Sequence, residues 1–155
     1  MADINEVILR EAPISRTFLY KRVLSAWQIT RLTDKSRQLL DDITMKMHIR
    51  FTTKDGVDYI WRVDQSPLSY AGYRVPLDDE TRRDLDEICT EEIASAVMDV
   101  VKSQISLTRE DIARETGRLF GFTRVSETIT RCVDAAVDLC VEKGALKDTG
   151  GRISE

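Results

Sequence analysis

The chain has 155 residues, of which 42% are hydrophobic and 32% are charged. This apolar fraction is large enough to build a core, so the composition excludes a wholly disordered chain. The sequence has no run of about 18 apolar residues that would span a membrane, and residues 1–6 have no secretory pattern. We therefore expect a folded cytoplasmic protein without a membrane segment.

The net charge of −4 conceals a difference between the two halves of the chain. Residues 1–75 contain 12 Lys and Arg against 9 Asp and Glu, which gives a net charge of +3. Residues 76–155 contain 11 against 18, which gives a net charge of −7. We therefore expect a polyanion to bind the first half rather than the second.

The three cysteines are too few for a closed disulfide framework, and none belongs to a Cys-x-x-Cys motif. Cys132 and Cys140 lie in one apolar helical pattern, and Cys89 stands apart from them. Buried free cysteines behave as small hydrophobic residues. We therefore expect Cys132 and Cys140 to fill the core and to have no redox role.

The first half of the chain contains three segments with helical periodicity. Apolar spacing predicts a helix over residues 3–11, and a second helix over residues 15–27 starts at a serine, a good N-cap. A third amphipathic helix is predicted over residues 34–48. The large apolar residues that this third helix is expected to bury are Leu39, Leu40, Ile43 and Met47.

A β-hairpin is predicted directly after the third helix. Residues 49–53 and 57–63 form its strands, and alternation in the second strand is typical of a half-buried one. Asp55 and Gly56 between them suit the positive φ angles of a tight type I′ turn. Three helices followed by a hairpin is the order of elements in a winged helix.

The second half repeats this order. Helices are predicted over residues 91–103, 108–120 and 126–143, with Thr90 as the N-cap of the first. Residues 145–153 then form a short or incomplete hairpin. Sliding the sequence on itself by 93 positions aligns aromatic residues with aromatic residues, caps with caps and core positions with core positions.

These patterns predict a mainly α fold with small β-hairpins, an α+β class, made of two tandem winged-helix-like units. The first unit covers residues 1–75, a connector covers residues 76–89, and the second unit covers residues 90–155 with a short wing. Tyr70, Tyr73 and Val75 are expected to pack against the first unit. The acidic run in the connector is interpreted as a solvated loop.

The sequence contains no catalytic motif. It lacks a phosphate-binding GxxxxGK[ST] loop, a GxGxxG fingerprint and a GxSxG elbow. The single histidine, His48, falls at the end of a predicted helix and is expected to pack or cap there. Asp41 and Asp42 are adjacent and splay to different sides of a helix, so they form no acid/base pair. We expect no catalytic residue, cofactor or metal in this chain.

DNA contact is the positive hypothesis. In a helix-turn-helix protein the third helix enters the major groove, and basic residues neutralise phosphates. The candidate DNA-binding residues cluster at the start of the third helix and along the hairpin: Arg31, Lys35, Arg37, Gln38, Arg50, Lys54 and Arg62. The alternative is that these are ordinary solvated charges, diluted by neighbouring carboxylates such as Asp34 and Asp55.

Both halves resemble a known family. The first half carries the resemblance in Pro13, Ile14, Leu19, Arg22, Val23, Trp27, Thr30 and Arg31, and the second half in residues 93–101, 108–116 and 119–124. Together they resemble the C-terminal domain of unknown function of large bacterial superfamily 1 DNA helicase-like proteins. The resemblance covers roughly residues 5–146, and it departs at Cys89, where the family often has a proline.

The resemblance implies a context rather than an activity. In that family the module follows an ATP-dependent helicase core, so no catalytic residue carries over to this chain. The leading hypothesis is a non-catalytic accessory module that engages or positions DNA through the first unit. The alternative is a protein-interaction module without DNA contact, which docks on other domains of a parent helicase-like protein or forms a homodimer.

Overall fold

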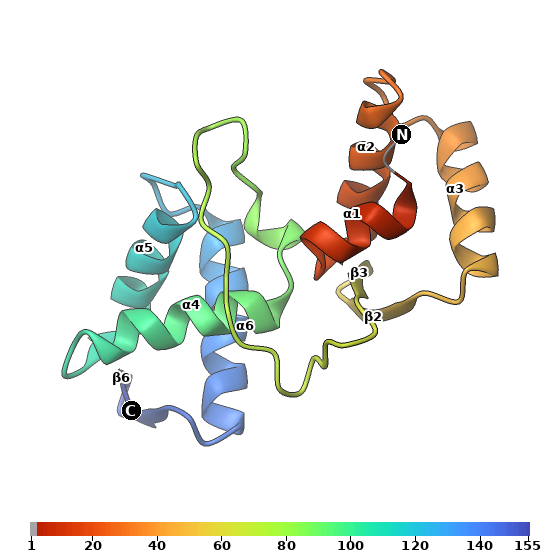
Figure 1. Cartoon of the computed structure of the whole chain (residues 1–155). Coiled ribbons are helices and arrows are strands. Elements are labelled where there is room, and N and C mark those ends of the chain that lie inside the picture. The colour runs from red at the N-terminus through yellow and green to blue at the C-terminus, as the bar shows by residue number, and fades with distance from the viewer. Residues whose placement is uncertain (1–2) are drawn as a thin grey trace. The chain divides into compact units, whose positions relative to one another are not determined.

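The computed structural model describes residues 3–155 and divides into two compact units, Met1–Ser69 and Tyr70–Glu155 (Figure 1). Within the described residues each unit holds three α-helices and one three-stranded antiparallel sheet. In both units the order is helix, short strand, helix, helix and a two-stranded hairpin. This architecture confirms the predicted α+β class, mainly helical with small hairpins.

The elements of the first unit begin at residues that cap them. In chain order they are α1 (Ile4–Glu11), β1 (Ile14–Ser15), α2 (Arg16–Ala26), α3 (Asp34–Lys46), β2 (Arg50–Lys54) and β3 (Val57–Trp61). The side chains of Asp3, Ser15 and Thr33 each accept a hydrogen bond from a backbone amide in the first turn of α1, α2 and α3. Satisfying these free amides fixes where each helix starts.

The sheet of the first unit has the strand order β1-β3-β2, so β2 is an edge strand. Asp55 and Gly56 join β2 to β3 with φ angles of 50° and 78°, which confirms the predicted tight turn. The core lies between α1, α2 and this sheet and includes Leu19, Val23 and Ile60, none of which has exposed surface.

The second unit contains one further short helix. Its elements are the 3-10 helix η1 (Leu85–Glu87), α4 (Thr90–Lys102), β4 (Leu107–Thr108), α5 (Arg109–Leu119), α6 (Glu127–Glu142), β5 (Lys147–Thr149) and β6 (Arg152–Ser154). The hairpin of β5 and β6 is short, as predicted. Thr90 is not the N-cap of α4 as predicted; Cys89 holds that position, without a side-chain hydrogen bond.

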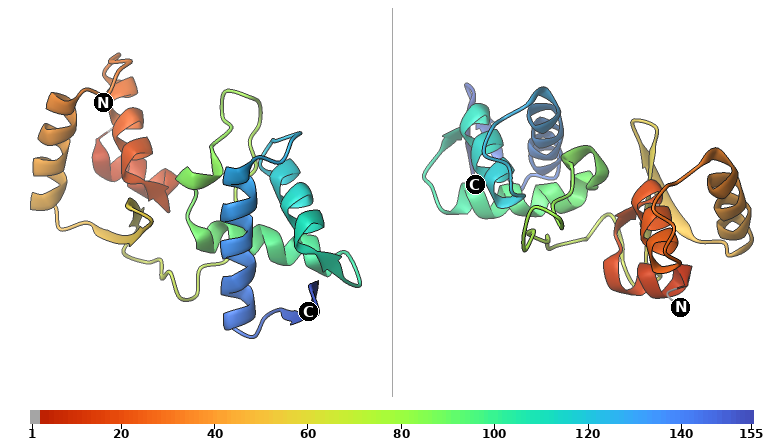
Figure 2. Two further views of the ribbon diagram at one scale, coloured as in Figure 1. Left: turned by 180° about the vertical axis from the view of Figure 1, so that it is seen from behind. Right: turned by 90° about the horizontal axis from the view of Figure 1, so that it is seen from above.

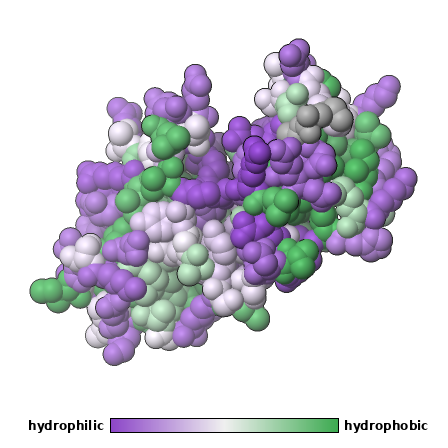
Figure 3. All heavy atoms as spheres, viewed as in Figure 1, coloured by the Kyte–Doolittle hydropathy of each residue, from purple (hydrophilic) through white to green (hydrophobic). Residues whose placement is uncertain are grey.

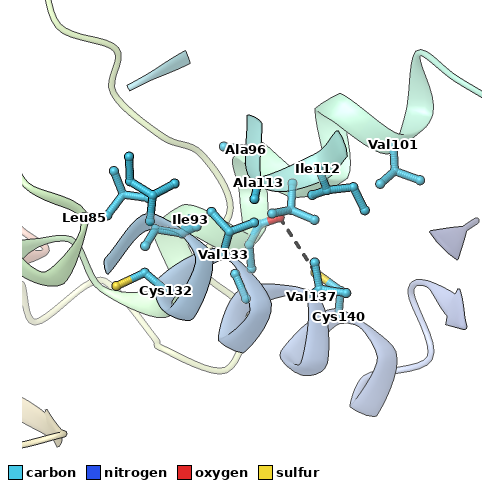
Figure 4. Packing of buried hydrophobic residues seen from close by; sticks show 14 of the residues in the cluster. Leu85, Ile93, Ala96, Val101, Ile112, Ala113, Cys132, Val133, Val137 and Cys140 are labelled. Carbon is cyan, nitrogen blue, oxygen red and sulfur yellow. Dashed lines mark hydrogen bonds between the residues drawn. The ribbon is translucent and has the colours of Figure 1, made fainter. Parts of the chain in front are cut away.

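The offset of 93 residues relates the two units element by element. It places β1 on β4, maps the first and last residues of α2 onto those of α5, and aligns the first residue of α3 with that of α6. In the second unit α4 crosses α6, and α5 lies beside them (Figures 1 and 2). Apolar side chains of these three helices form the core (Figure 4).

The third helices of the two units, α3 and α6, differ in how many of their residues are buried. The residues that α6 buries are Ile129, Cys132, Val133, Ala136, Val137 and Cys140. By contrast, α3 buries only Leu40 and Thr44. The prediction that α3 buries Leu39 is wrong, because 57% of this residue is exposed.

The chain from Tyr70 onward, separated from the end of β3 by residues 62–69, belongs to the second unit rather than the first. Tyr73 was expected against the first unit, but its ring packs edge-on against Phe120, with the ring centroids 6.1 Å apart. Its hydroxyl donates a 2.8 Å hydrogen bond to the Asp99 carboxylate. The division between the units therefore follows Ser69, ahead of the boundary at Val75 that composition indicated.

A buried carboxylate holds this segment in place. Glu92 on α4 has no exposed surface and accepts hydrogen bonds from the guanidinium groups of Arg74 and Arg83, at 2.8–3.2 Å. The backbone amide of Arg74 donates a further bond of 3.0 Å. Arg74 and Arg83, which lie in the segment expected to be loop and connector, thus pair with one buried carboxylate of the second unit.

Candidate nucleic-acid interface

The loop before α3 and the outward side of α3 present three of the predicted DNA-binding residues. Thr33 and Ser36 form a reciprocal capping box that starts α3. Arg31 lies in the loop just before it, and Lys35 and Gln38 follow in its first turns. All three side chains are exposed, and none forms a hydrogen bond or ion pair with any residue of the described chain 3–155.

Lys54 is the fourth residue of this kind. It ends β2 at the tip of the hairpin, is exposed, and has no polar partner among the described residues. A lysine at a hairpin tip can approach a phosphate without giving up an internal contact. The structure therefore leaves Arg31, Lys35, Gln38 and Lys54 available to a ligand.

The other three predicted residues are held inside the unit. The guanidinium of Arg50 donates to the carbonyl oxygens of Val63 and Gln65, at 2.9 and 3.1 Å. That of Arg62 pairs with Asp64 at 2.9 Å and also donates to a backbone carbonyl oxygen of α1. These two arginines fasten the chain that follows the hairpin.

Arg37 ties α3 to α2. Its guanidinium donates a 3.0 Å hydrogen bond to the Thr17 hydroxyl and lies over the ring of Tyr20, 5.9 Å from the centroid. Two carboxylates, Asp34 and Asp42, are exposed on α3 and reduce the positive field of its cations. The outward face of α3 is thus of mixed charge.

A groove of about 660 Å³ lies between α2, α3 and the hairpin. Arg16, which sequence reasoning did not single out, crosses it. The Arg16 guanidinium donates to Asp58 on β3 at 2.9 Å, and to Tyr20 and Thr44 at 3.2 and 3.0 Å. It also lies over the ring of Phe51, 5.1 Å from the centroid. One side chain therefore connects two helices and the hairpin.

The Tyr20 hydroxyl is the buried centre of this network. It donates a 2.5 Å hydrogen bond to Asp41 and lies 3.0 Å from the Thr44 hydroxyl. Burial raises the pKa of Tyr20, and the bond to Asp41 raises it further. Burial lowers the pKa of Arg16, but its bonds to Tyr20 and Asp58 outweigh this, and the net shift is upward. The network keeps a neutral phenol and a charged guanidinium.

The structure also shows where the paired aspartates and the single histidine lie. Asp41 faces the groove and Asp42 faces solvent, so the two carboxylates diverge as predicted. His48 follows α3 with a φ angle of 53°, and its Nδ1 lies 3.0 Å from the carbonyl oxygen of Lys46.

Within residues 3–155, no cluster of three or more His, Cys, Asp and Glu side chains has an arrangement that could hold a metal ion. None of the described helices has the length and apolarity needed to cross a lipid bilayer.

Comparison with known proteins gives one match. A family described as "Protein of unknown function (DUF3320)" matches residues 2–38, under a quarter of the chain. The matched segment runs through α1 and α2 into α3 and includes Arg31, Lys35, Arg37 and Gln38. No curated protein and no solved structure matches the chain. The match agrees with the expected domain of unknown function for this segment.

Proposed function

We propose that this chain is a non-catalytic, tandem winged-helix module that engages DNA in the bacterial cytoplasm as part of a helicase-like protein. The observation that carries the proposal is the set of exposed side chains without internal partners at the start of α3 and at the hairpin tip. Arg31, Lys35 and Lys54 would neutralise phosphates, and Gln38 would reach base edges.

The winged-helix assignment is supported by the order of elements in each unit. A short strand follows the first helix, and the later hairpin pairs with it to give the sheet orders β1-β3-β2 and β4-β6-β5. In a helix-turn-helix protein the helix in the position of α3 is the one that enters the major groove. The proposed contacts therefore lie where such a fold places its recognition helix.

The charge of the units favours the first one. Residues 1–69 hold 11 Lys and Arg against 9 Asp and Glu, a net charge of +2, whereas residues 70–155 hold 12 against 18, a net charge of −6. Because three cations contact phosphates, the logarithm of the binding constant should fall against that of salt with a slope of about −3. Binding is weak and nearly independent of sequence.

The test is fluorescence-anisotropy titration of duplex and forked DNA across a salt series. Reversing charge at Arg31 and Lys35 to Glu should abolish binding. The matched control reverses Arg124 and Lys147, two exposed cations of the second unit, which changes the net charge equally and should retain most of the affinity. Absence of salt-dependent binding at protein concentrations up to about 100 μM would falsify the proposal, because non-specific binders register in that range.

The helicase context rests on the resemblance of the sequence. It is checked by the genomic reading frame upstream of residue 1, where helicase motifs are expected in the same frame. An upstream region without coding potential would contradict this part of the proposal and leave DNA binding untouched.

A second candidate function is protein docking or self-association, and a specific observation favours it. Leu39 and Met45 on α3 are 57% and 76% exposed, and Phe51 on β2 is 52% exposed. Apolar surface is visible along α3 in Figure 3. This function predicts an association that survives charge reversal at Arg31 and Lys35. Light scattering of the purified chain tests for a homodimer.

A further inference from the structure

The third helix of the first unit, α3, is attached to its neighbours in a different way from α6. In the second unit α6 packs closely against both α4 and α5. Among the described residues, α3 comes as close to no other helix or strand, and it buries only Leu40 and Thr44. Figures 1 and 2 show α3 standing apart from α2. The close helix packing that fixes α6 is therefore missing at α3.

The apolar attachment of α3 is narrow. Leu40 is 1% exposed, and Ile43 and Met47, the residue that follows α3, are partly buried against the same core. These three residues recur at intervals of three and four, so they lie along one line of the helix. A single line of apolar side chains, of which one is almost fully buried, holds α3 to the first core.

Polar bonds supply the remaining attachment. A groove of about 660 Å³ separates α3 from the start of α2 and from the hairpin. Three side-chain hydrogen bonds join α2 to α3 at this groove: Arg16 to Thr44 at 3.0 Å, Tyr20 to Asp41 at 2.5 Å, and Arg37 to Thr17 at 3.0 Å. Water replaces such bonds when a helix leaves its place, so each of them adds little net stability. We call these three bonds the α2–α3 latch.

The chain on both sides of α3 can absorb a movement of the helix. Residues 27–31, before α3, are exposed and lie outside regular helix and strand. His48, after α3, is exposed as well. Loop residues and residues at the ends of elements are the ones that form hinges. The helix can therefore move while α2 and the hairpin keep their structure.

We propose that α3 opens as a separate segment: it leaves the first core while α1, α2 and the sheet stay folded, and the α2–α3 latch sets how often it does so. Segments that contact ligands are drawn from the parts of a protein with low local stability. Because α3 carries Lys35 and Gln38, the opening makes the orientation of these two residues adjustable. The opening is a property of the free chain, so failure of DNA binding would leave it standing.

The test is native-state amide hydrogen exchange of the full chain, followed by NMR and corrected for intrinsic exchange rates. The amides of residues 38–46 should exchange at least about a hundredfold faster than the central amides of α2, because α3 opens without unfolding of the unit. The central amides of α6 should exchange as slowly as those of α4, since the two helices share one core.

Substitutions separate the opening of α3 from unfolding of the whole unit. Tyr20→Phe removes one hydroxyl of the latch and keeps the ring, so it should speed exchange in α3 about tenfold. Thr17→Val removes the acceptor of Arg37 and is the second latch variant, with an expected increase of about fivefold. Val7→Ala is the control, because Val7 belongs to the part of the core that stays folded. It should speed exchange in α2 at least about tenfold and leave α3 unchanged.

Three results would overturn the proposal. The first is exchange of α3 and α2 with the same free energy, which would mean that α3 opens only when the unit unfolds. The second is an acceleration of α3 by Val7→Ala as large as that of α2. The third is exchange in α3 that a folded latch variant, Tyr20→Phe or Thr17→Val, leaves unchanged, which would show that the bonds to α2 do not hold the helix.

Discussion

Glu92 shows how one residue can determine the extent of a unit. Its carboxylate has no exposed surface, and it stands in the first turn of α4, where the helix dipole favours a negative charge. Burial raises the pKa of Glu92, but the hydrogen bonds from Arg83 and Arg74 lower it by more, so the net shift is downward. The carboxylate is therefore ionised in the folded protein, paired with cations from a segment that reads as a loop.

Glu92→Gln should destabilise the second unit by about 3 kcal/mol, because it leaves two guanidinium groups without their buried counter-charge. The measurement is urea unfolding at pH 7, followed by circular dichroism. Glu91→Gln, a change one residue earlier in the same helix turn, is the control and should cost less than about 1 kcal/mol. Equal losses in the two variants would show that the pairing with arginine does not stabilise the fold.

The same substitution should change how stability depends on pH. A folded-state pKa below the unfolded value, which is about 4.3 for glutamate, means that the unfolded chain takes up the proton first as pH falls. The stability that Glu92 contributes is complete above pH 4.3 and is lost as pH falls through its folded pKa. The difference between wild type and Glu92→Gln should therefore shrink below about pH 4. A difference that is constant from pH 7 to pH 3 would contradict it.

At the scale of elements, the two units share a clamp at the first residue of their second helices. Arg16 begins α2 and bonds to α3 and β3, and its counterpart Arg109 begins α5. Arg109 pairs with Asp138 on α6 at 2.7 Å and reaches Asp148 on β5 at 3.5 Å. In both units one arginine thus ties the third helix to the hairpin.

The Arg16 clamp should matter more to its unit than the Arg109 clamp. The Arg16 side chain is 18% exposed, against 32% for Arg109, and α3 has few buried apolar residues of its own. Arg16→Ala should destabilise the first unit by about 2 kcal/mol, because buried Tyr20 and Thr44 lose a partner. Arg109→Ala should cost the second unit less than about 1 kcal/mol.

Tryptophan fluorescence separates these two effects. The two tryptophans of the chain, Trp27 and Trp61, both lie in the first unit, so their emission follows that unit alone. Circular dichroism follows both units. A fluorescence midpoint in urea that Arg16→Ala leaves unchanged would count against the clamp.

The elements themselves could be predicted from the sequence because the signals that set them are local. Ser15 and Ser126 cap their helices through an amide three residues on, and the Asp55–Gly56 turn needs only its own two residues. The clamps could not be predicted, since Arg16 and Asp58 are 42 positions apart and leave no periodic pattern. The exposure of Leu39 was missed for a related reason: helical spacing identifies an apolar face but not whether anything covers it.

At the scale of the whole molecule, the boundary between the units is the feature that composition misplaced. Pro76 and the charged run of residues 78–84 made residues 76–89 read as a connector. In the structure, this stretch and the residues just before it supply Tyr73, Arg74, Arg83 and Leu85 to the second unit. A loop that carries the counter-charges of a buried carboxylate is part of the domain it covers.

The boundary can be tested by comparing two fragments of the second unit. Residues 70–155 should fold alone, with dispersed amide resonances and a cooperative thermal transition. Residues 90–155, the unit that composition indicated, lack Arg74 and Arg83 and leave Glu92 buried without a counter-ion. This fragment should be unfolded or should melt at least about 15 °C lower, because an unpaired buried charge and the loss of Tyr73 and Leu85 together cost several kcal/mol. Adding Glu92→Gln should partly restore the stability of the shorter fragment and should destabilise the longer one. Equal stability of the two fragments would contradict this prediction and would show that residues 70–89 are only a connector.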